Sequence, residues 1–229
     1  MSFPSIPHHS ADWAPFLNRG LLRYRPDPIK RSADLLVASA VLSLGLPLLA
    51  VVALLVWMGS PGRLFYVQRR LGRGYRTFGC IKFRTMVAGA DRKLRLALKG
   101  SAQLREEYAR DFKLKHDPRI TPIGKLLRRT SLDELPQFWN ILRGDMSLVG
   151  PRPIVKKEIA YYGDAMDDVM TVRPGLTGLW QTSGRNNLSY QQRVALDLHY
   201  VHHRSFWLDL RILWKTIAVV LWPTDKGAY

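Results

Sequence analysis

The chain has 229 residues and is strongly basic, because 35 Lys and Arg against 18 Asp and Glu give a formal net charge of +17 at pH 7. Such a charge indicates anionic partners: lipid headgroups, phosphorylated substrates or nucleic acid. The single cysteine, Cys80, excludes an internal disulfide and is compatible with a reducing compartment. The length suits one folded domain beside a membrane element.

Residues 1–29 are predicted to form an irregular N-terminal segment. Five prolines prevent a long helix there: Pro4, Pro7, Pro15, Pro26 and Pro28. A cleaved signal peptide is not expected, because the apolar stretch starts late and lacks a small-residue cleavage site.

A hydrophobic run from Leu35 to Met58 is the main feature of the next segment, residues 30–59. Lys30 and Arg31 precede the run, and five arginines follow it between positions 63 and 76. A spanning helix usually has its basic residues mainly on one side, so this pattern favours a hairpin whose ends return to the same face. Gly45 and Pro47 interrupt the run near its middle. A bend caused by Pro47 would divide it into two legs of roughly 17 Å, too short for a hydrocarbon core of about 30 Å. A kinked single-pass helix is the alternative.

The remaining segment, residues 60–229, is predicted to be a cytosolic catalytic domain. Its expected elements are two short strands at 64–67 and 77–83, surface helices within 88–112, and helices at 123–129, 133–143, 155–162 and 190–203. Loops are expected at 144–153 and, rich in glycine, at 174–184. The fold class is therefore α+β and mainly helical, with a re-entrant membrane hairpin and a short β-hairpin.

The last expected helix, residues 206–222, carries an apolar face. Its members are Trp207, Leu210, Leu213, Trp214, Ile217 and Leu221. Amphipathic helices with such aromatics often lie in the membrane interface, and ordinary core packing explains the pattern equally well.

The candidate chemistry lies in residues 130–153, TSLDELPQFWNILRGDMSLVGPRP, which contain adjacent carboxylates at Asp133 and Glu134. Cations surround them in the sequence: Lys125, Arg128, Arg129, Arg143 and Arg152. We expect a carboxylate beside these cations to have a low pKa, and thus to serve as a nucleophile or a Mg²⁺ ligand. Alternatively, Ser131 and Glu134 form a helix capping box with no chemical role.

Three motifs together resemble the bacterial sugar transferase family, the monotopic phosphoglycosyl transferases. They are residues 130–153, the upstream IKFRTM at 81–86, and the downstream VRPGLTG at 172–178. The resemblance is strongest to the exopolysaccharide-initiating branch that transfers galactose or glucose phosphate. It implies a re-entrant hairpin broken at Pro47, with Arg31 and Asp34 at the mouth of the hairpin.

The resemblance also implies a reaction. Members of the family transfer a hexose-1-phosphate from a UDP-sugar to polyprenyl (undecaprenyl) phosphate and release UMP. Asp133 would be the nucleophile that forms an aspartyl phosphosugar, and Glu134 would be a base or a metal ligand. Mg²⁺, held by Asp133 and Glu134, is the implied cofactor.

Further residues are candidates for binding the two anionic substrates. Arg152 lies between two prolines that stiffen its loop, and its guanidinium matches phosphate geometry. The other phosphate candidates are Arg129, Lys82 and Arg84, and the nucleotide or sugar candidates are Arg173, Gln181 and Arg185. Arg152 as an ordinary turn residue, and Lys82 with Arg84 as a solvated strand face, are the alternatives.

These inferences place the protein on the cytoplasmic face of a bacterial inner membrane, in contact with anionic lipids. No nucleic-acid partner is expected, and a homodimer is one assembly that the sequence leaves open. Two rival functions remain at this point: a nucleic-acid-binding protein, which the charge alone would suggest, and a non-catalytic membrane scaffold with the same fold.

Overall fold

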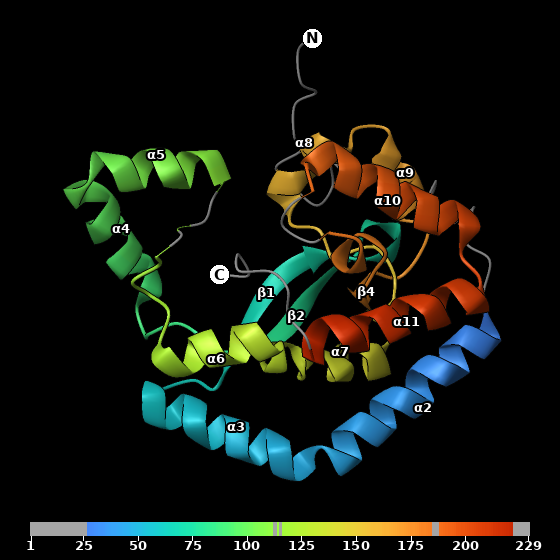
Figure 1. Ribbon diagram of the computed structural model, residues 1–229, viewed down its shortest axis with the longest axis horizontal. Helices are drawn as coiled ribbons and strands as arrows, with labels where there is room; N and C mark the ends of the chain where they lie inside the picture. The colour runs from blue at the N-terminus through green and yellow to red at the C-terminus, as the bar shows by residue number, and fades with distance from the viewer. Residues whose placement is uncertain (1–26, 112–113, 115, 185–187, 222–229) are drawn as a thin grey trace.

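The computed structural model describes residues 27–111, 114, 116–184 and 188–221. The expected irregular segment 1–29 therefore lies almost wholly outside the described residues, as does Arg185. Figure 1 shows a long bent helix pair along one side of the molecule, α2 and α3. The helices α6, α7 and α11 lie next to this pair, and a β-hairpin stands behind them.

The chain is mainly helical, as predicted. The longer helices are α2 (Pro28–Leu44), α3 (Leu46–Gly59), α4 (Ala90–Gly100), α5 (Ala102–Asp111), α6 (Pro122–Thr130), α7 (Gln137–Arg143), α10 (Tyr190–His203) and α11 (Phe206–Leu221). Short helices are η2 (Arg73–Tyr75), η3 (Leu132–Glu134), η4 (Lys156–Glu158), α8 (Ile159–Tyr162), α9 (Ala165–Val169) and η5 (Trp180–Thr182).

Two small sheets complete the fold. The predicted β-hairpin is confirmed as an antiparallel pair, β1 (Phe65–Leu71) with β2 (Thr77–Phe83), in which β1 is longer than expected. The second sheet, parallel and formed by β3 (Ser147–Val149) and β4 (Gly175–Thr177), was not predicted. Sequence reasoning assigned both segments to loops, because strands of three residues carry too few positions for an alternating pattern.

The bend between α2 and α3 lies at Gly45, within the predicted break at Gly45 and Pro47. The two helices meet at 63°. A side chain at Gly45 would collide with the carbonyl oxygen of Val41, so the close turn requires glycine. Pro47 instead occupies the first turn of α3, where its missing N–H leaves no hydrogen bond unmade. Within the described ranges, only this bent pair, and no single helix, has the length and apolar character to cross a membrane.

Both predicted residues at the mouth of the hairpin contact the part of the chain that follows the hairpin. The Arg31 guanidinium donates to the carbonyl oxygens of Ile141 and Leu142 at the end of α7, at 2.7 and 3.1 Å. Asp34 is 3% exposed, and its carboxylate accepts from the Leu148 backbone N–H at 2.9 Å. The first turns of α2 are thereby attached to α7 and β3.

Helix α11 presents large apolar side chains outward, which answers one question that the sequence left open. Trp207 and Trp214 are each 74% exposed, and Phe206, Leu210 and Ile217 are exposed as well. Core packing therefore explains Leu213, which packs against the main core beside the buried Ile212, but not the exposed members of the predicted face. An exposed apolar face of this size is typical of a surface that contacts a partner or lipid.

Candidate active site

Helix α7 is held on strand β2 by one buried amide, and this contact determines where the carboxylates lie. The Asn140 side chain accepts from the Ile81 N–H at 3.0 Å and donates to the Gly79 carbonyl at 2.8 Å. It thereby replaces a neighbouring strand at the edge of β2. Because α7 follows Asp133 and Glu134 directly, these residues are placed beside the next residue of the strand, Lys82.

The carboxylates belong to the short helix η3, and the predicted capping box is absent. Ser131 has a left-handed backbone conformation, with φ of +58°, and its side chain caps no N–H of the turn. This conformation costs a residue other than glycine roughly 1 kcal/mol or more, so the surrounding packing imposes it. The Glu134 carboxylate instead forms a salt bridge with the Lys82 ammonium. The interpretation of Glu134 as a mere cap is therefore wrong.

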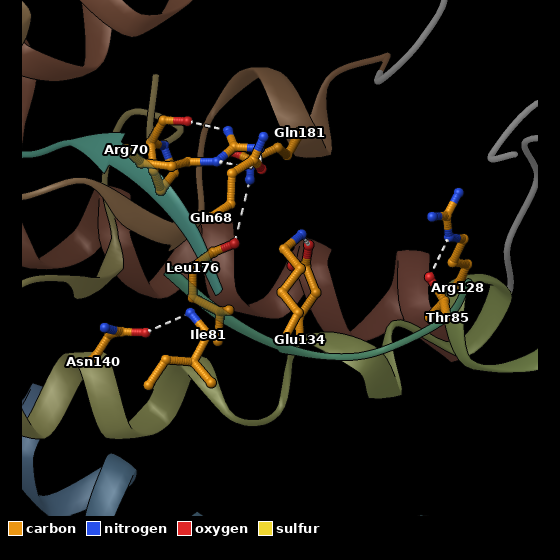
Figure 2. Close-up of polar contacts among 11 residues, drawn as sticks. Gln68, Arg70, Ile81, Thr85, Arg128, Glu134, Asn140, Leu176 and Gln181 are labelled. Atoms are coloured by element: carbon orange, nitrogen blue, oxygen red, sulfur yellow. Dashed lines mark hydrogen bonds and ion pairs between the residues drawn. The ribbon is translucent and has the colours of Figure 1, made fainter. Parts of the chain in front are cut away.

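Glu134 is the more exposed of the two carboxylates, and it lines a large pocket of about 740 Å³. Burial alone would raise the pKa of Glu134, but Lys82 and then Arg152 outweigh that effect and hold it below the ordinary value. Glu134 is therefore ionised at neutral pH. Figure 2 shows it between Arg70 with Gln68 on one side and Arg128 with Thr85 on the other.

Asp133 behaves differently from the expectation of a low pKa. Only 9% of the residue is exposed, and it is not among the residues that line the pocket. Burial, and then repulsion from Glu134, raise the pKa of Asp133 to about 6, although Lys82 and Arg128 oppose the shift. At pH 7 roughly nine-tenths of such a group is ionised, so a carboxylate nucleophile is still available. It is a more basic nucleophile than an ordinary aspartate.

Arg152 lines the same pocket and rests against an aromatic ring. Its guanidinium carbon lies 5.7 Å from the centroid of the Trp180 ring, which Arg193 of α10 approaches to 4.9 Å. Within the described part of the chain, Arg152 has no hydrogen bond or salt bridge, so its N–H donors are available to a ligand. This arrangement is compatible with the predicted phosphate clamp.

A second group of cations lies on the other side of the carboxylates. Arg128 donates from Nε to the Thr85 hydroxyl at 2.9 Å, and its charge acts on Asp133. Arg119 forms a bidentate pair with Asp117, with Nη2–Oδ2 at 2.6 Å, and both residues line the pocket. Sequence reasoning counted Arg128 only as a neighbouring charge and gave Arg119 no role.

The structure brings together only some of the predicted binding residues. Lys82, Arg152 and Gln181 lie at the pocket or its carboxylates. Arg84 donates to the Ser60 and Pro61 carbonyls, where it holds the end of α3 rather than the pocket. The assumed shared face of Lys82 and Arg84 is lost because β2 ends at Phe83, before Arg84.

Two further candidates lie elsewhere. Arg129 is exposed and does not line the pocket. Arg173 donates to the Gly144 carbonyl at 2.9 Å and borders a small cavity beside Arg31 and Asp34. Its position gives no support for a contact with nucleotide or sugar, and that role stays a prediction. Asp145 accepts a hydrogen bond from the Asn140 side chain at 3.1 Å.

The donor set around Asp133 and Glu134 is small. Among the described residues, no group of three His, Cys, Asp or Glu side chains could hold a metal ion. Mg²⁺ nevertheless binds through one or two carboxylates when substrate phosphates and water supply the other ligands. Two adjacent carboxylates fit that requirement. They do not fit a metal that needs a complete cage of protein ligands.

The pocket combines ionic and apolar walls. Glu134, Arg128, Arg119 and Arg152 provide the charge, whereas Val37 of α2, Phe138 of α7, and Leu213, Ile217 and Val220 of α11 provide apolar surface. A site of this composition suits an enzyme that handles phosphorylated substrates next to a hydrophobic chain.

Comparisons with known proteins agree with that class. The bacterial sugar transferase family matches residues 25–223. The exopolysaccharide production protein ExoY of Sinorhizobium fredii is 48% identical over 200 residues, which cover 87% of this chain and 88% of that protein. The UDP-galactose-lipid carrier transferase of Erwinia amylovora is 45% identical over 213 residues, or 93% of this chain and 44% of that protein.

The undecaprenyl-phosphate galactose phosphotransferase of Salmonella typhimurium is 45% identical over 201 residues, 88% of this chain and 42% of that protein. The chain thus spans less than half the length of two of these relatives and most of the third. It belongs to the bacterial sugar transferase family. Membership favours the transferase interpretation over the nucleic-acid-binding one.

Proposed function

We propose that this protein transfers a hexose-1-phosphate from a UDP-sugar to polyprenyl phosphate, releasing UMP and forming a polyprenyl-diphosphate-sugar. Relatives named for undecaprenyl-phosphate sugar transfer support the reaction class. The names of the relatives include both galactose and glucose transferases, so the proposal extends to either hexose. The product would start an exopolysaccharide chain, in keeping with the ExoY relative.

The observation that carries the proposal is the pocket with two kinds of wall. The charged wall, with Glu134 and Arg152, suits the phosphates of both substrates. The apolar wall comes from α2, α7 and α11, and it suits an isoprenoid chain. Helices α2 and α11 also carry large apolar side chains that are exposed. A soluble nucleotide substrate would need only the first wall.

The proposed chemistry has two steps at Asp133. In the first, a carboxylate oxygen of Asp133 attacks the β-phosphorus of the UDP-sugar, the bond from that phosphorus to the bridging oxygen breaks, and UMP leaves. In the second, a phosphate oxygen of the polyprenyl phosphate attacks the same phosphorus, and the bond to Asp133 breaks. Both nucleophiles are anionic near neutral pH, so neither step requires a strong base.

The residues around Asp133 offset the charge of the substrates. Lys82 and Arg128 lower the energy of the Asp133 carboxylate, and Arg152 would receive the negative charge on the phosphoryl oxygens. Asp133 and Glu134 would hold Mg²⁺, which when bound neutralises phosphate charge. Asp133 is only 9% exposed, so we expect a movement of η3 to bring the Asp133 side chain toward the pocket when the donor binds.

The bent pair α2–α3 would enter one leaflet and return, leaving residues 60–221 on the cytoplasmic face of the inner membrane. The exposed apolar surfaces of α2, α3 and α11 and the net charge of +17 support this placement beside anionic lipids. The hairpin would present the pocket at the depth where the phosphate of a polyprenyl lipid lies.

Release of UMP tests the reaction. Purified protein with Mg²⁺, undecaprenyl phosphate and a panel of UDP-sugars is expected to release UMP with one hexose donor, UDP-galactose or UDP-glucose. The same panel without the lipid separates the first step from the complete reaction. The proposal fails when no UDP-sugar yields UMP from protein whose fold is intact by circular dichroism.

Cysteine labelling tests the hairpin. Cys80 is buried, and its replacement by Ser leaves a chain to which single cysteines are added at Ser60 and at the chain ends. We expect a membrane-impermeant maleimide to label all of them only from the cytoplasmic side. Labelling of position 60 from the outer side would mean that the helix pair crosses the membrane.

A further inference from the structure

Arg70 is a buried cation whose role neither the sequence motifs nor the proposed reaction explains. It lies in β1 with 9% of its surface exposed. Its Nε and Nη2 donate to the Gln68 side-chain oxygen at 3.2 and 2.7 Å, and its Nη1 donates to the Pro153 carbonyl. Among the described residues no carboxylate forms a salt bridge with it, so its charge is not neutralised by direct pairing. Figure 2 shows Arg70 and Gln68 on the side of Glu134 away from Arg128.

The Pro153 carbonyl belongs to the loop that carries Arg152. The next peptide is bound to the same strand, because the Leu71 N–H donates to the Ile154 carbonyl at 2.8 Å. At the other end of the loop, Gly150 packs on β4 so closely that a side chain would lie 2.8 Å from the Gly175 nitrogen. Strand β1 and the β3–β4 sheet therefore hold the loop from both ends.

Arg152 itself depends on these attachments. Its guanidinium contacts the Trp180 ring without a hydrogen bond or salt bridge in the described ranges, so nothing polar fixes its direction. The hydrogen bond from Arg70 to the Pro153 carbonyl places Arg70 beside the residue that follows Arg152. Burial lowers the pKa of Arg70, and repulsion from Arg152 lowers it further. An anion bound at Arg152 would relieve that repulsion.

We propose that Arg70 is a positioning residue, which holds the Arg152 loop through the Pro153 carbonyl and so aims the Arg152 guanidinium at a substrate phosphate in the pocket. The inference rests on the proposed function and assigns Arg70 no contact with substrate. This role requires the branched guanidinium of an arginine, because its two terminal nitrogens donate separately to Pro153 and to Gln68.

A double-mutant cycle tests whether Arg70 acts through Arg152. We expect Arg70→Gln to lower kcat/KM for UMP release on the order of 10- to 100-fold, since small displacements of a positioned group have effects of that size. In an Arg152→Gln background, the same change is expected to have almost no further effect, because the residue it positions is already lost. Separate KM values for the UDP-sugar and for undecaprenyl phosphate identify which phosphate Arg152 receives.

Two controls separate positioning from folding. Arg69→Gln changes an exposed neighbour on the same strand and is expected to leave kcat/KM unchanged. Arg70→Lys keeps the charge without the fork and is expected to give an intermediate rate. The same double-mutant cycle is repeated by measuring the affinity of each variant for UMP with titration calorimetry. This measurement does not depend on catalytic rate, so it also applies to a slow Arg152→Gln enzyme.

The inference is overturned when Arg70→Gln matches the wild type, or when it has the same effect with and without Arg152. The second result would mean a structural role independent of the clamp. Absence of UMP release by the wild-type protein would instead reject the proposed function, and the calorimetric cycle would still report on the two arginines.

Discussion

Replacement of Asp133 by Asn is expected to reduce UMP release by roughly 10⁴-fold or more, the size of loss seen when a covalent nucleophile is removed. Asn has the shape of Asp and lacks the charged oxygen that would attack phosphorus. The surrounding cations and the pocket remain in the variant, so binding of the UDP-sugar should persist. The measurement is single-turnover release of UMP with the donor alone.

Mass spectrometry of peptides locates the covalent step. Wild-type protein mixed with donor and no lipid acceptor is expected to carry the mass of a hexose phosphate on Asp133. Asp91→Asn, on an exposed position of α4, is the matched control and should form the adduct normally. Because Glu134 lines the pocket and Asp133 does not, an adduct on Glu134 would contradict the nucleophile assignment and exchange the two roles.

The thermal stability of Asp133→Asn, compared with the wild type over a range of pH, gives an independent measurement of the pKa of the buried Asp133 carboxylate. The folded-state pKa of Asp133 is about 6, above the value of 3.8 for an unperturbed Asp, so the folded protein binds more protons than the unfolded chain between these values. Stability from this group is therefore present at low pH and is lost as pH rises through 6. Asp133→Asn should melt like the wild type near pH 4 and be more stable above pH 6, by about 3 kcal/mol.

The hairpin shows how far the sequence alone determines the fold. Its apolar run, its basic flanks and a break were all predicted, because they depend on composition and local chemistry. The break was expected at Gly45 and Pro47 with the proline ring as its cause, whereas the structure bends at Gly45 and places Pro47 in the first turn of α3. Glycine marks the bend only when the carbonyl of Val41 is known to approach it, which is a property of three-dimensional packing.

The site was predictable where the chemistry is local and not where it depends on long-range contacts. Asp133, Glu134 and Arg152 came from one motif. The raised pKa of Asp133 could not be predicted, because burial opposes the cations and burial is invisible in a sequence. Arg70 was missed for the same reason, since its partner Pro153 lies 83 positions away. A buried arginine near the end of a strand whose first three residues are exposed carries no signal of its own.

Lys82 connects the two carboxylates, and its replacement by Gln is expected to move the pH dependence of the reaction. Its charge lowers the pKa of both Asp133 and Glu134, so removing it raises both. The attacking form of Asp133 is the ionised one, which in the wild type appears as pH rises through about 6. In Lys82→Gln the midpoint of the rise in UMP release with pH should therefore move to higher pH, by roughly one pH unit or more.

At pH 7 a shift of one unit would lower the ionised fraction of Asp133 from about nine-tenths to about half, so the Lys82→Gln enzyme is expected to lose roughly 2-fold in rate, and roughly 10-fold if the shift is two units. Most of this loss should return at pH 8.5. Lys82→Arg keeps the charge and should retain the wild-type pH profile, and Lys93→Gln on the exposed face of α4 should change nothing. An equal loss at every pH would show that Lys82 binds substrate phosphate directly, instead of setting the ionisation of the carboxylates. The profile thus separates the predicted phosphate contact of Lys82 from the salt bridge that the structure contains.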